Sequence, residues 1–157
     1  MEKETNKRKI YLIIIIFVVL LAVSGFGSLF SANPESDAWY NQVKSSITPP
    51  GYVFGIAWTI LYILIGVSIY LSLKVEKKEN KKIILFWIIN LVTNALWTSF
   101  FFGIKNPVLA FIDLIIIWIT CLMLIILNWK NNRTSAYLLI PYLLWLTFAG
   151  LLNILAI

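Results

Sequence analysis

The chain has no histidine, and Cys121 is the single cysteine among its 157 residues. Without histidine, Ser–His and Cys–His nucleophile pairs and histidine-ligated haem iron cannot be built. One thiol allows neither a disulfide within the chain nor a zinc cluster. We therefore expect no resident metal and no resident cofactor.

Charged side chains are also scarce, at 13% of the residues against 61% hydrophobic ones. A water-soluble domain of this size cannot hide so much apolar surface. In lipid each spanning segment must satisfy its own backbone as a helix, and the uninterrupted apolar runs lack the alternation of a barrel. The predicted fold class is all-α: one domain, residues 1–157, forming an integral membrane bundle of five transmembrane helices. The predicted spans, each of about 20 residues or slightly more, are 10–30, 52–73, 83–104, 106–129 and 134–157.

The net charge of +6 does not indicate nucleic-acid binding, because the basic residues lie beside the ends of the spans. With the N-terminus in the cytoplasm, all of the 13 basic residues except Lys44 and Lys105 lie on the inner side. The excess of Lys and Arg in cytoplasmic loops then predicts a multi-pass protein with its N-terminus inside and its C-terminus outside. A bacterial cell membrane is the expected location.

The first span has a second interpretation. A basic stretch, an apolar run and the small residues Ser31 and Ala32 also resemble a cleavable signal peptide. The apolar run continues to Phe30, which is longer than a usual signal core. We expect the span to be retained as the first helix of the bundle.

The longest connector, residues 31–51, is predicted to lie outside and to contain a short helix. Asn33 can cap this helix, and Trp39, Val43 and Ile47 then recur at helical spacing. The apolar stripe would lie either over the mouth of the bundle, as a lid, or on the membrane surface as an anchor. Pattern alone favours neither.

Four of the seven tryptophans, Trp58, Trp97, Trp118 and Trp145, lie well inside their spans, where an indole N–H needs a partner. At 1.5 Å per residue, Trp58, Trp97 and Trp145 lie about 9 to 18 Å below the outer helix ends. Other side chains share their helical faces and similar depths. These are Phe54 and Tyr62 in the second span, Asn90 and Asn94 in the third and Ala149 in the fifth. The sequence therefore predicts an outward-opening pocket lined by aromatic rings.

Asp113 is the only charged residue inside a span. A carboxylate is costly in hydrocarbon, so Asp113 should point inward toward a partner such as Asn94 or a Trp N–H. It then either holds helices together or contacts a ligand or proton. For Asn90 and Asn94, hydrogen bonding between helices is an equally good interpretation.

These residues, in this order, resemble the TspO/MBR family, which includes the tryptophan-rich sensory proteins of bacteria and the mitochondrial translocator protein. The resemblance covers most of the chain and depends on several short pieces taken together. They are Trp39-Tyr40, Thr48-Pro49-Pro50-Gly51, Phe54, Trp58, Leu61-Tyr62, Asn90, Asn94, Trp97, Asp113, Ala136, Leu139, Pro141-Tyr142, Trp145, Phe148-Ala149 and Asn153.

The resemblance implies a five-helix bundle, commonly a homodimer, whose pocket binds porphyrins, haem-like tetrapyrroles and hydrophobic drug-like molecules. Some family members degrade protoporphyrin in light, and the matching catalytic positions here are Trp58 and Trp145. Two features depart from the family: Ile47 stands where a Trp often precedes Thr-Pro-Pro, and residues 151–157 lack the Tyr and Arg pattern of cholesterol recognition. The family's ligand-binding positions fall here on Tyr40, Pro49, Phe54, Trp58, Tyr62, Asn94, Trp97, Trp145 and Ala149, with Asn90 and Asp113 as further polar positions.

Three functions are thus open. The first is a membrane receptor or sensor for protoporphyrin or a related tetrapyrrole, which stacks on Trp faces. The second is light-dependent porphyrin degradation in the same pocket. The third, a transporter of hydrophobic anions, is disfavoured because the spans contain a single acid and no internal repeat.

Overall fold

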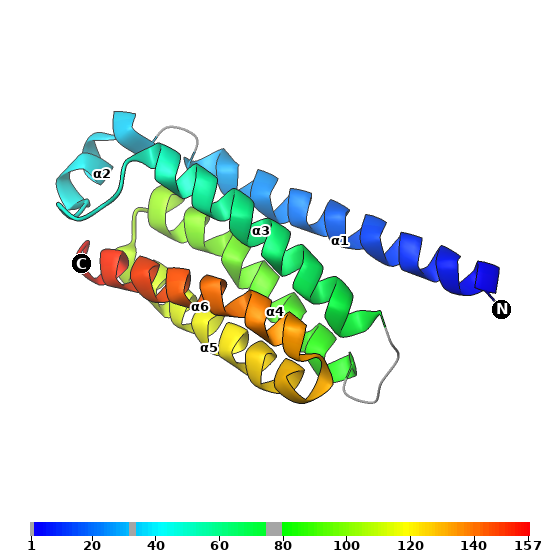
Figure 1. Ribbon diagram of the computed structural model, residues 1–157. Coiled ribbons are helices and arrows are strands. Elements are labelled where there is room, and N and C mark those ends of the chain that lie inside the picture. The colour runs from blue at the N-terminus through cyan, green and yellow to red at the C-terminus, as the bar shows by residue number, and fades with distance from the viewer. Residues whose placement is uncertain (1, 32–33, 75–79) are drawn as a thin grey trace.

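The computed structural model describes residues 2–31, 34–74 and 80–157, with side chains from Asn6 onward. Within these residues all regular secondary structure is helical and no strand occurs, and five helices are long and apolar enough to cross a membrane. The predicted all-α bundle with five spans is therefore confirmed (Figure 1). The long helices are α1 (Glu2–Ser31), α3 (Gly51–Leu73), α4 (Asn80–Thr98), α5 (Pro107–Asn131) and α6 (Arg133–Ile154).

Asparagine side chains begin the last two helices. The Asn106 side chain accepts a hydrogen bond from the Leu109 N–H at 2.9 Å, and Pro107 occupies the first turn of α5. Asn132 accepts from the Ser135 N–H at 3.2 Å and starts α6 directly after α5. Both caps satisfy amide groups that a helix start leaves without intrahelical partners. The resulting short turn makes α5 and α6 antiparallel neighbours.

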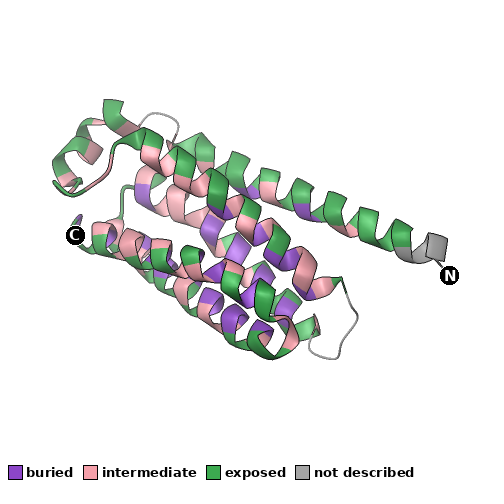
Figure 2. Ribbon diagram, in the orientation of Figure 1, coloured by how far each residue is buried: buried purple, intermediate pink, exposed green. Residues whose placement is uncertain are grey.

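The five long helices form a closed ring in the order α1, α3, α6, α5, α4. The most extensive packing is between α5 and its neighbours α6 and α4. In Figure 2 the ribbon is coloured as buried at many positions of α3 to α6, whereas the described residues of α1 are exposed over most of the helix. Ile16 and Val23 are the buried side chains among the described residues of α1. The first helix is thus the least firmly packed member of the ring.

The connector between α1 and α3 contains a 3-10 turn, η1 (Pro34–Ser36), followed by the short helix α2 (Ala38–Val43). Asp37 caps α2 by accepting the Trp39 N–H at 2.8 Å. The expected cap, Asn33, lies outside the described residues. The helix ends at Val43, so the predicted stripe does not continue to Ile47, which is 51% exposed.

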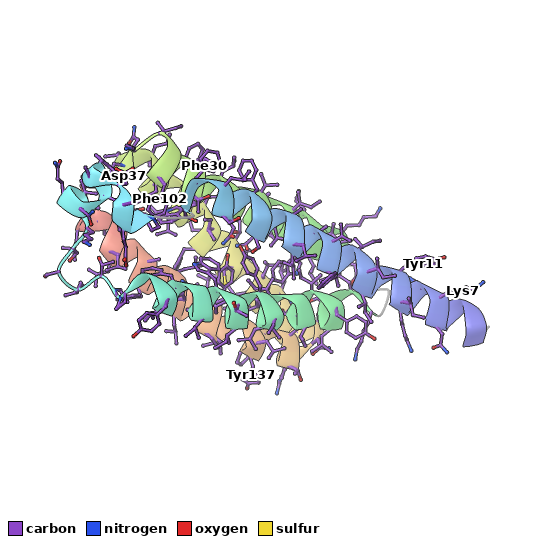
Figure 3. All side chains as sticks on the ribbon, turned by 90° about the horizontal axis from the view of Figure 1, so that it is seen from above. Lys7, Tyr11, Phe30, Asp37, Phe102 and Tyr137 are labelled. Atoms are coloured by element: carbon purple, nitrogen blue, oxygen red, sulfur yellow. The ribbon has the colours of Figure 1, made fainter. Side chains whose placement is uncertain are left out.

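A π-helical turn, η2 (Ser99–Gly103), ends the third span. The Ile104 N–H donates to the Ser99 carbonyl at 2.7 Å, and Lys105 then adopts a left-handed backbone with φ of 57°. A Cβ on Gly103 would lie 2.9 Å from the Phe30 ring, so only glycine lets η2 approach the end of α1 this closely. Figure 3 shows Phe30, Asp37 and Phe102 at this end of the molecule and Lys7 and Tyr11 at the opposite end.

A buried polar cluster joins α3, α5 and α6 at the end of the bundle opposite α2. The hydroxyl of Ser135 lies 2.7 Å from that of Ser68 and 2.8 Å from that of Ser72, which also donates to the Asn128 side chain at 2.8 Å. All four side chains are at most 1% exposed. This cluster stabilises the helix packing, and the sequence analysis did not identify it.

Candidate ligand-binding cavity

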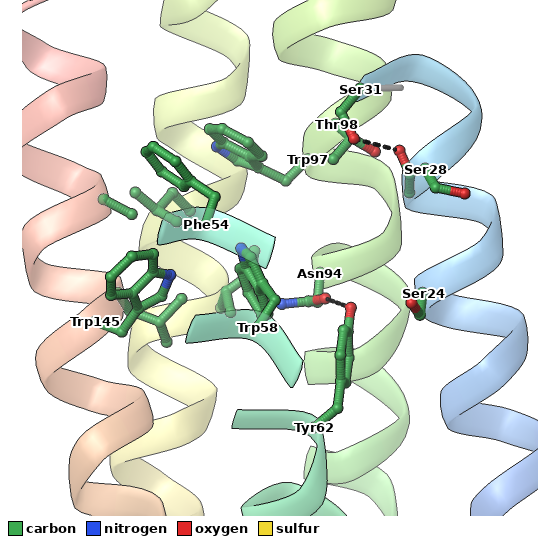
Figure 4. A pocket seen from close by; sticks show the side chains of 15 residues that line it. Ser24, Ser28, Ser31, Phe54, Trp58, Tyr62, Asn94, Trp97, Thr98 and Trp145 are labelled. Atoms are coloured by element: carbon green, nitrogen blue, oxygen red, sulfur yellow. Dashed lines mark hydrogen bonds between the residues drawn. The ribbon is translucent and has the colours of Figure 1, made fainter. Parts of the chain in front are cut away.

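A cavity of about 200 Å³ lies between the helices in the half of the bundle nearer α2 (Figure 4). All five long helices contribute to its lining. Seven of the nine predicted ligand-binding residues are among the lining residues: Phe54, Trp58, Tyr62, Asn94, Trp97, Trp145 and Ala149.

Aromatic rings from three helices form one side of the cavity. We call Phe54, Trp58, Tyr62, Trp97 and Trp145 the aromatic wall. Phe54 meets Trp145 edge to face with ring centroids 5.6 Å apart, and the Trp58 and Tyr62 centroids are 5.4 Å apart. Such tilted pairs hold one another in place and leave ring faces available for a planar molecule.

The indole N–H groups of the mid-span tryptophans differ in their partners. Trp97 donates to the Asn153 side chain at 3.2 Å, and Trp118, which does not line the cavity, donates to Thr147 at 2.9 Å. Trp145 Nε1 is buried and has no hydrogen-bond partner among the described residues. Figure 4 shows the nitrogen edge of Trp145 turned toward Trp58. A buried donor without a partner is costly, so Trp145 is the donor in this wall that a ligand acceptor would satisfy.

A chain of hydrogen bonds links the cavity to the bundle centre. The Tyr62 hydroxyl donates to the Asn94 side-chain oxygen at 3.1 Å, and Asn94 donates to the Tyr142 hydroxyl at 3.0 Å. Tyr142 donates in turn to Asn90 at 3.2 Å, and Asn90 donates to Thr120 at 2.9 Å. The chain joins α3, α4, α5 and α6. Asn90 and Asn94 therefore hold the helices together, and Asn94 also faces the cavity.

Asp113 lies within α5 and is 5% exposed, as expected of an inward-facing carboxyl group. It does not line the cavity, and its Oδ2 has no hydrogen-bond partner among the described residues. The predicted partners bond elsewhere: Asn94 bonds the two tyrosines, and the Trp97 N–H bonds Asn153. The pairing of Asp113 with either group was therefore wrong.

Tyr40 and Pro49 do not line the cavity. Tyr40 packs on the π-helical turn, with its ring centroid 5.5 Å from that of Phe102, and this partial burial raises the pKa of its hydroxyl. In the structure, α2 therefore packs on η2 and the adjoining ends of α4 and α5. Its role as a lid over the cavity or as an anchor on the membrane surface stays a prediction.

An ion pair fastens α2 in this position. The Lys105 ammonium lies 2.8 Å from one carboxylate oxygen of Asp37 and 5.8 Å from the centre of the Trp39 ring. Its hydrogen bond lowers the pKa of the Asp37 carboxyl. The connector is thus tied to the turn between α4 and α5.

The opposite side of the cavity comes mainly from α1, which the sequence analysis did not identify. We call Ser24, Ser28, Ser31 and Thr98 the hydroxyl wall; Thr98 belongs to α4. Gly27 lies beside Thr98 in this wall, and a Cβ there would be in ordinary contact with the Thr98 hydroxyl oxygen at 3.6 Å. The available signal was the helical spacing of the three serines in an otherwise apolar span.

The cavity has a lateral neighbour. Ser24 and Tyr62 also line an apolar groove of about 550 Å³ between α1 and α3. The cavity itself is smaller than the roughly 300 to 1,000 Å³ typical of small-molecule sites. The groove adjoins the cavity between α1 and α3, which are neighbours with limited mutual packing.

Within the described residues, no group of three His, Cys, Asp or Glu side chains could hold a metal ion.

Five apolar helices around a cavity with an aromatic wall define a class: multi-pass, all-helical membrane proteins with an intramembrane pocket. The chain belongs to the TspO/MBR family, whose model matches residues 14–156. The resemblance predicted from the sequence is thereby confirmed.

Relatives from distant organisms agree with this assignment. The chain is 35% identical to the tryptophan-rich protein TspO of Archaeoglobus fulgidus over 137 residues, which is 87% of this chain and 88% of that protein. It is 36% identical to the membrane protein YtaB of Bacillus subtilis, over 93% of this chain and 94% of that one. The similarity extends to the translocator protein of Bos taurus, at 28% identity over 87% of this chain and 83% of that protein.

Proposed function

We propose that this protein is a membrane receptor or sensor that binds a porphyrin, a related tetrapyrrole or another planar hydrophobic ligand in the cavity. The observation that carries the proposal is the aromatic wall, in which rings from α3, α4 and α6 surround one space. Planar apolar molecules bind such sites because they stack on the rings and because their apolar surface is removed from water. The unpartnered Trp145 N–H offers a hydrogen bond that would fix the ligand's orientation.

The charge of the cavity lining and the cavity volume limit how a porphyrin can bind. No charged side chain lines the cavity. We therefore expect the carboxylates of protoporphyrin to stay outside it, because burying an unpaired carboxylate is costly. Since the cavity measures about 200 Å³, we expect the macrocycle to extend into the adjoining groove between α1 and α3.

Protoporphyrin titration with tryptophan fluorescence tests the proposal. We expect saturable quenching in the wild-type protein, and at least tenfold weaker binding after Trp58→Ala or Trp145→Ala, because each change removes a stacking surface worth about 1.5 kcal/mol or more. Trp118→Ala is the matched control, since Trp118 lies outside the cavity. Equal affinity in all four proteins would contradict the binding site.

Light-dependent degradation of porphyrin is the second candidate function, with Trp58 and Trp145 as the catalytic pair. Both indoles line the cavity, where an excited porphyrin could exchange electrons with them in the presence of dioxygen as oxidant. Illuminated protein should then convert protoporphyrin to a new absorbing product. The double variant Trp58→Phe with Trp145→Phe keeps a stacking ring at both positions, so product formation should stop although binding persists.

Transport and dimer formation remain open. The name of the Bos taurus relative, translocator protein, indicates movement of a ligand across the membrane. Protoporphyrin flux into proteoliposomes would separate transport from binding alone. We also propose a homodimer, for which chemical cross-linking in the membrane is the direct test.

A further inference from the structure

The hydroxyl wall has a definite hydrogen-bonding polarity. Ser28 donates its single hydroxyl proton to the Gly25 carbonyl at 2.8 Å, and Ser31 donates to the Gly27 carbonyl at 3.1 Å. Thr98 donates to the Ala95 carbonyl at 3.2 Å. A hydroxyl has one proton and two lone pairs, so a hydroxyl whose proton is committed presents only acceptors. These three side chains therefore offer acceptors, not donors, to the cavity.

The aromatic wall has the opposite polarity. Its buried, unpartnered polar atom is Trp145 Nε1, an indole nitrogen that can only donate. Figure 4 shows Trp145 on one side of the cavity and Ser28, Ser31 and Thr98 on the other, with Trp58 between them. A molecule lying flat along Trp58 would thus meet a donor at one edge and acceptors at the other.

Charge narrows the ligand class further. Among the residues that the structure describes, no Lys, Arg, Asp or Glu side chain lines the cavity. An ionised group on the buried part of a ligand would have no counter-ion, and its desolvation would not be offset. The buried part of the ligand must be uncharged.

We propose that the cavity selects an uncharged planar aromatic ring system with an N–H or O–H donor along one edge and an acceptor along the opposite edge. The donor faces Ser28, Ser31 and Thr98, and the acceptor faces Trp145. This inference rests on the proposed binding function and specifies its ligand. Ser28, Ser31 and Thr98 are then specificity-determining residues, because their oxygens accept a hydrogen bond from a ligand donor at the edge opposite Trp145.

Norharmane is a suitable probe, because this flat three-ring molecule carries an N–H on one edge and a pyridine nitrogen on the other. Its 9-methyl analogue has the same shape and lacks the donor. Titrations should be done at mildly alkaline pH, where the pyridine nitrogen is unprotonated. We expect the wild-type protein to bind norharmane about 5 to 10 times more tightly than the methyl analogue, the range of one or two net hydrogen bonds.

Variants of the hydroxyl wall separate recognition from structure. Ser28→Ala with Ser31→Ala, and separately Thr98→Val, should weaken norharmane binding by roughly 3 to 10 times and leave the methyl analogue within about twofold. Thr93→Val is the matched control, since Thr93 makes the same kind of bond to its own helix, to the Ile89 carbonyl at 2.8 Å, and does not line the cavity. It should change neither affinity.

Carbazole tests the opposite edge, because it keeps the N–H but lacks the pyridine nitrogen. Trp145→Phe should weaken norharmane binding several-fold more than carbazole binding. A purely structural effect of any variant would weaken all probes equally, and that result would overturn the proposal.

The proposal would also be overturned if the wild-type protein bound norharmane and its methyl analogue equally, or bound neither. The protoporphyrin titration described above judges the receptor function independently. Quenching by protoporphyrin together with no preference for the donor would leave the receptor function standing and remove this ligand class.

Discussion

Tyr142 illustrates how single polar groups organise the interior of this bundle. Its side chain is fully buried, and its hydroxyl accepts from Asn94 at 3.0 Å while donating to Asn90 at 3.2 Å. Hydrogen bonds between membrane helices contribute modestly, about 0.6 kcal/mol on average and up to about 2. One oxygen that satisfies two amides nevertheless fixes the rotation of α4 against α6. The cavity lining on α4 depends on that rotation.

We predict that Tyr142→Phe lowers the free energy of unfolding by about 1 to 2 kcal/mol, because two hydrogen bonds are lost and both amides keep an unmet group. Denaturant unfolding in micelles would measure the change. The control is Tyr137→Phe, which alters a tyrosine that is 54% exposed and should change stability by less than about 0.5 kcal/mol. Equal stability of both variants would contradict the role of the Tyr142 hydroxyl.

The turn between α4 and α5 concentrates three unusual features at the scale of the element. The helix ends in the π-helical turn η2, Lys105 follows with φ of 57°, and the same residue forms the ion pair with Asp37. A left-handed backbone costs a non-glycine residue about 1 kcal/mol or slightly more. An exposed ion pair such as the one between Lys105 and Asp37 contributes little to the stability of the fold. The turn is thus held in its shape by the packing of α2 and the aromatic rings beneath it.

Two substitutions separate these contributions. Lys105→Ala and Lys105→Gly both remove the ion pair, but only glycine relieves the backbone, so we expect Lys105→Gly to be more stable by about 0.5 to 1 kcal/mol. Thermal unfolding in micelles would measure the difference. Equal stability would show that φ at this position costs nothing.

Asp37→Asn isolates the charge, because asparagine still caps α2. It should have only a small effect, and added salt should reduce that effect further. The lowered pKa of Asp37 sets the pH dependence: the stabilisation is present above the ordinary carboxyl pKa and is lost as pH falls through the lowered one.

Sequence patterns predicted the spans and the faces that carry Trp58, Asn94 and Trp145, because helical periodicity and apolar length are local properties. They did not predict η2, since the 3.6-residue periodicity of apolar side chains does not show where the backbone hydrogen bonds change from the α-helical to the π-helical pattern. The partner of Asp113 was wrong for another reason: contacts between helices depend on which helices are neighbours and how each is rotated. The serines of α1 were missed because their acceptor character appears only with their bonds to the Gly25 and Gly27 carbonyls.

At the scale of the whole molecule, the two ends of the bundle differ in charge and in structure. The end carrying α2 has Lys44 and Lys105, and the basic residues beside the other end are more numerous. This asymmetry predicts that α2 and the cavity half of the bundle face the outside. A ligand would then enter from the outer leaflet or the external medium.

Labelling with a membrane-impermeant maleimide tests this orientation. In a Cys121→Ala background, Ser46→Cys in the exposed connector should react in intact cells, and Arg133→Cys between α5 and α6 should react only after permeabilisation. The wild-type protein is a built-in control, because Cys121 is fully buried and should not react. The reverse pattern would invert the predicted topology.

The sparse packing of α1 has a consequence for biogenesis. Among the described residues of α1, Ile16 and Val23 are the buried side chains, and its ring neighbours α3 and α4 follow it in the chain and are translated later. We infer that α1 remains a solitary span in lipid until the other four have associated, and that it docks last. Three residues of the hydroxyl wall belong to α1, so the cavity would be completed only when α1 docks.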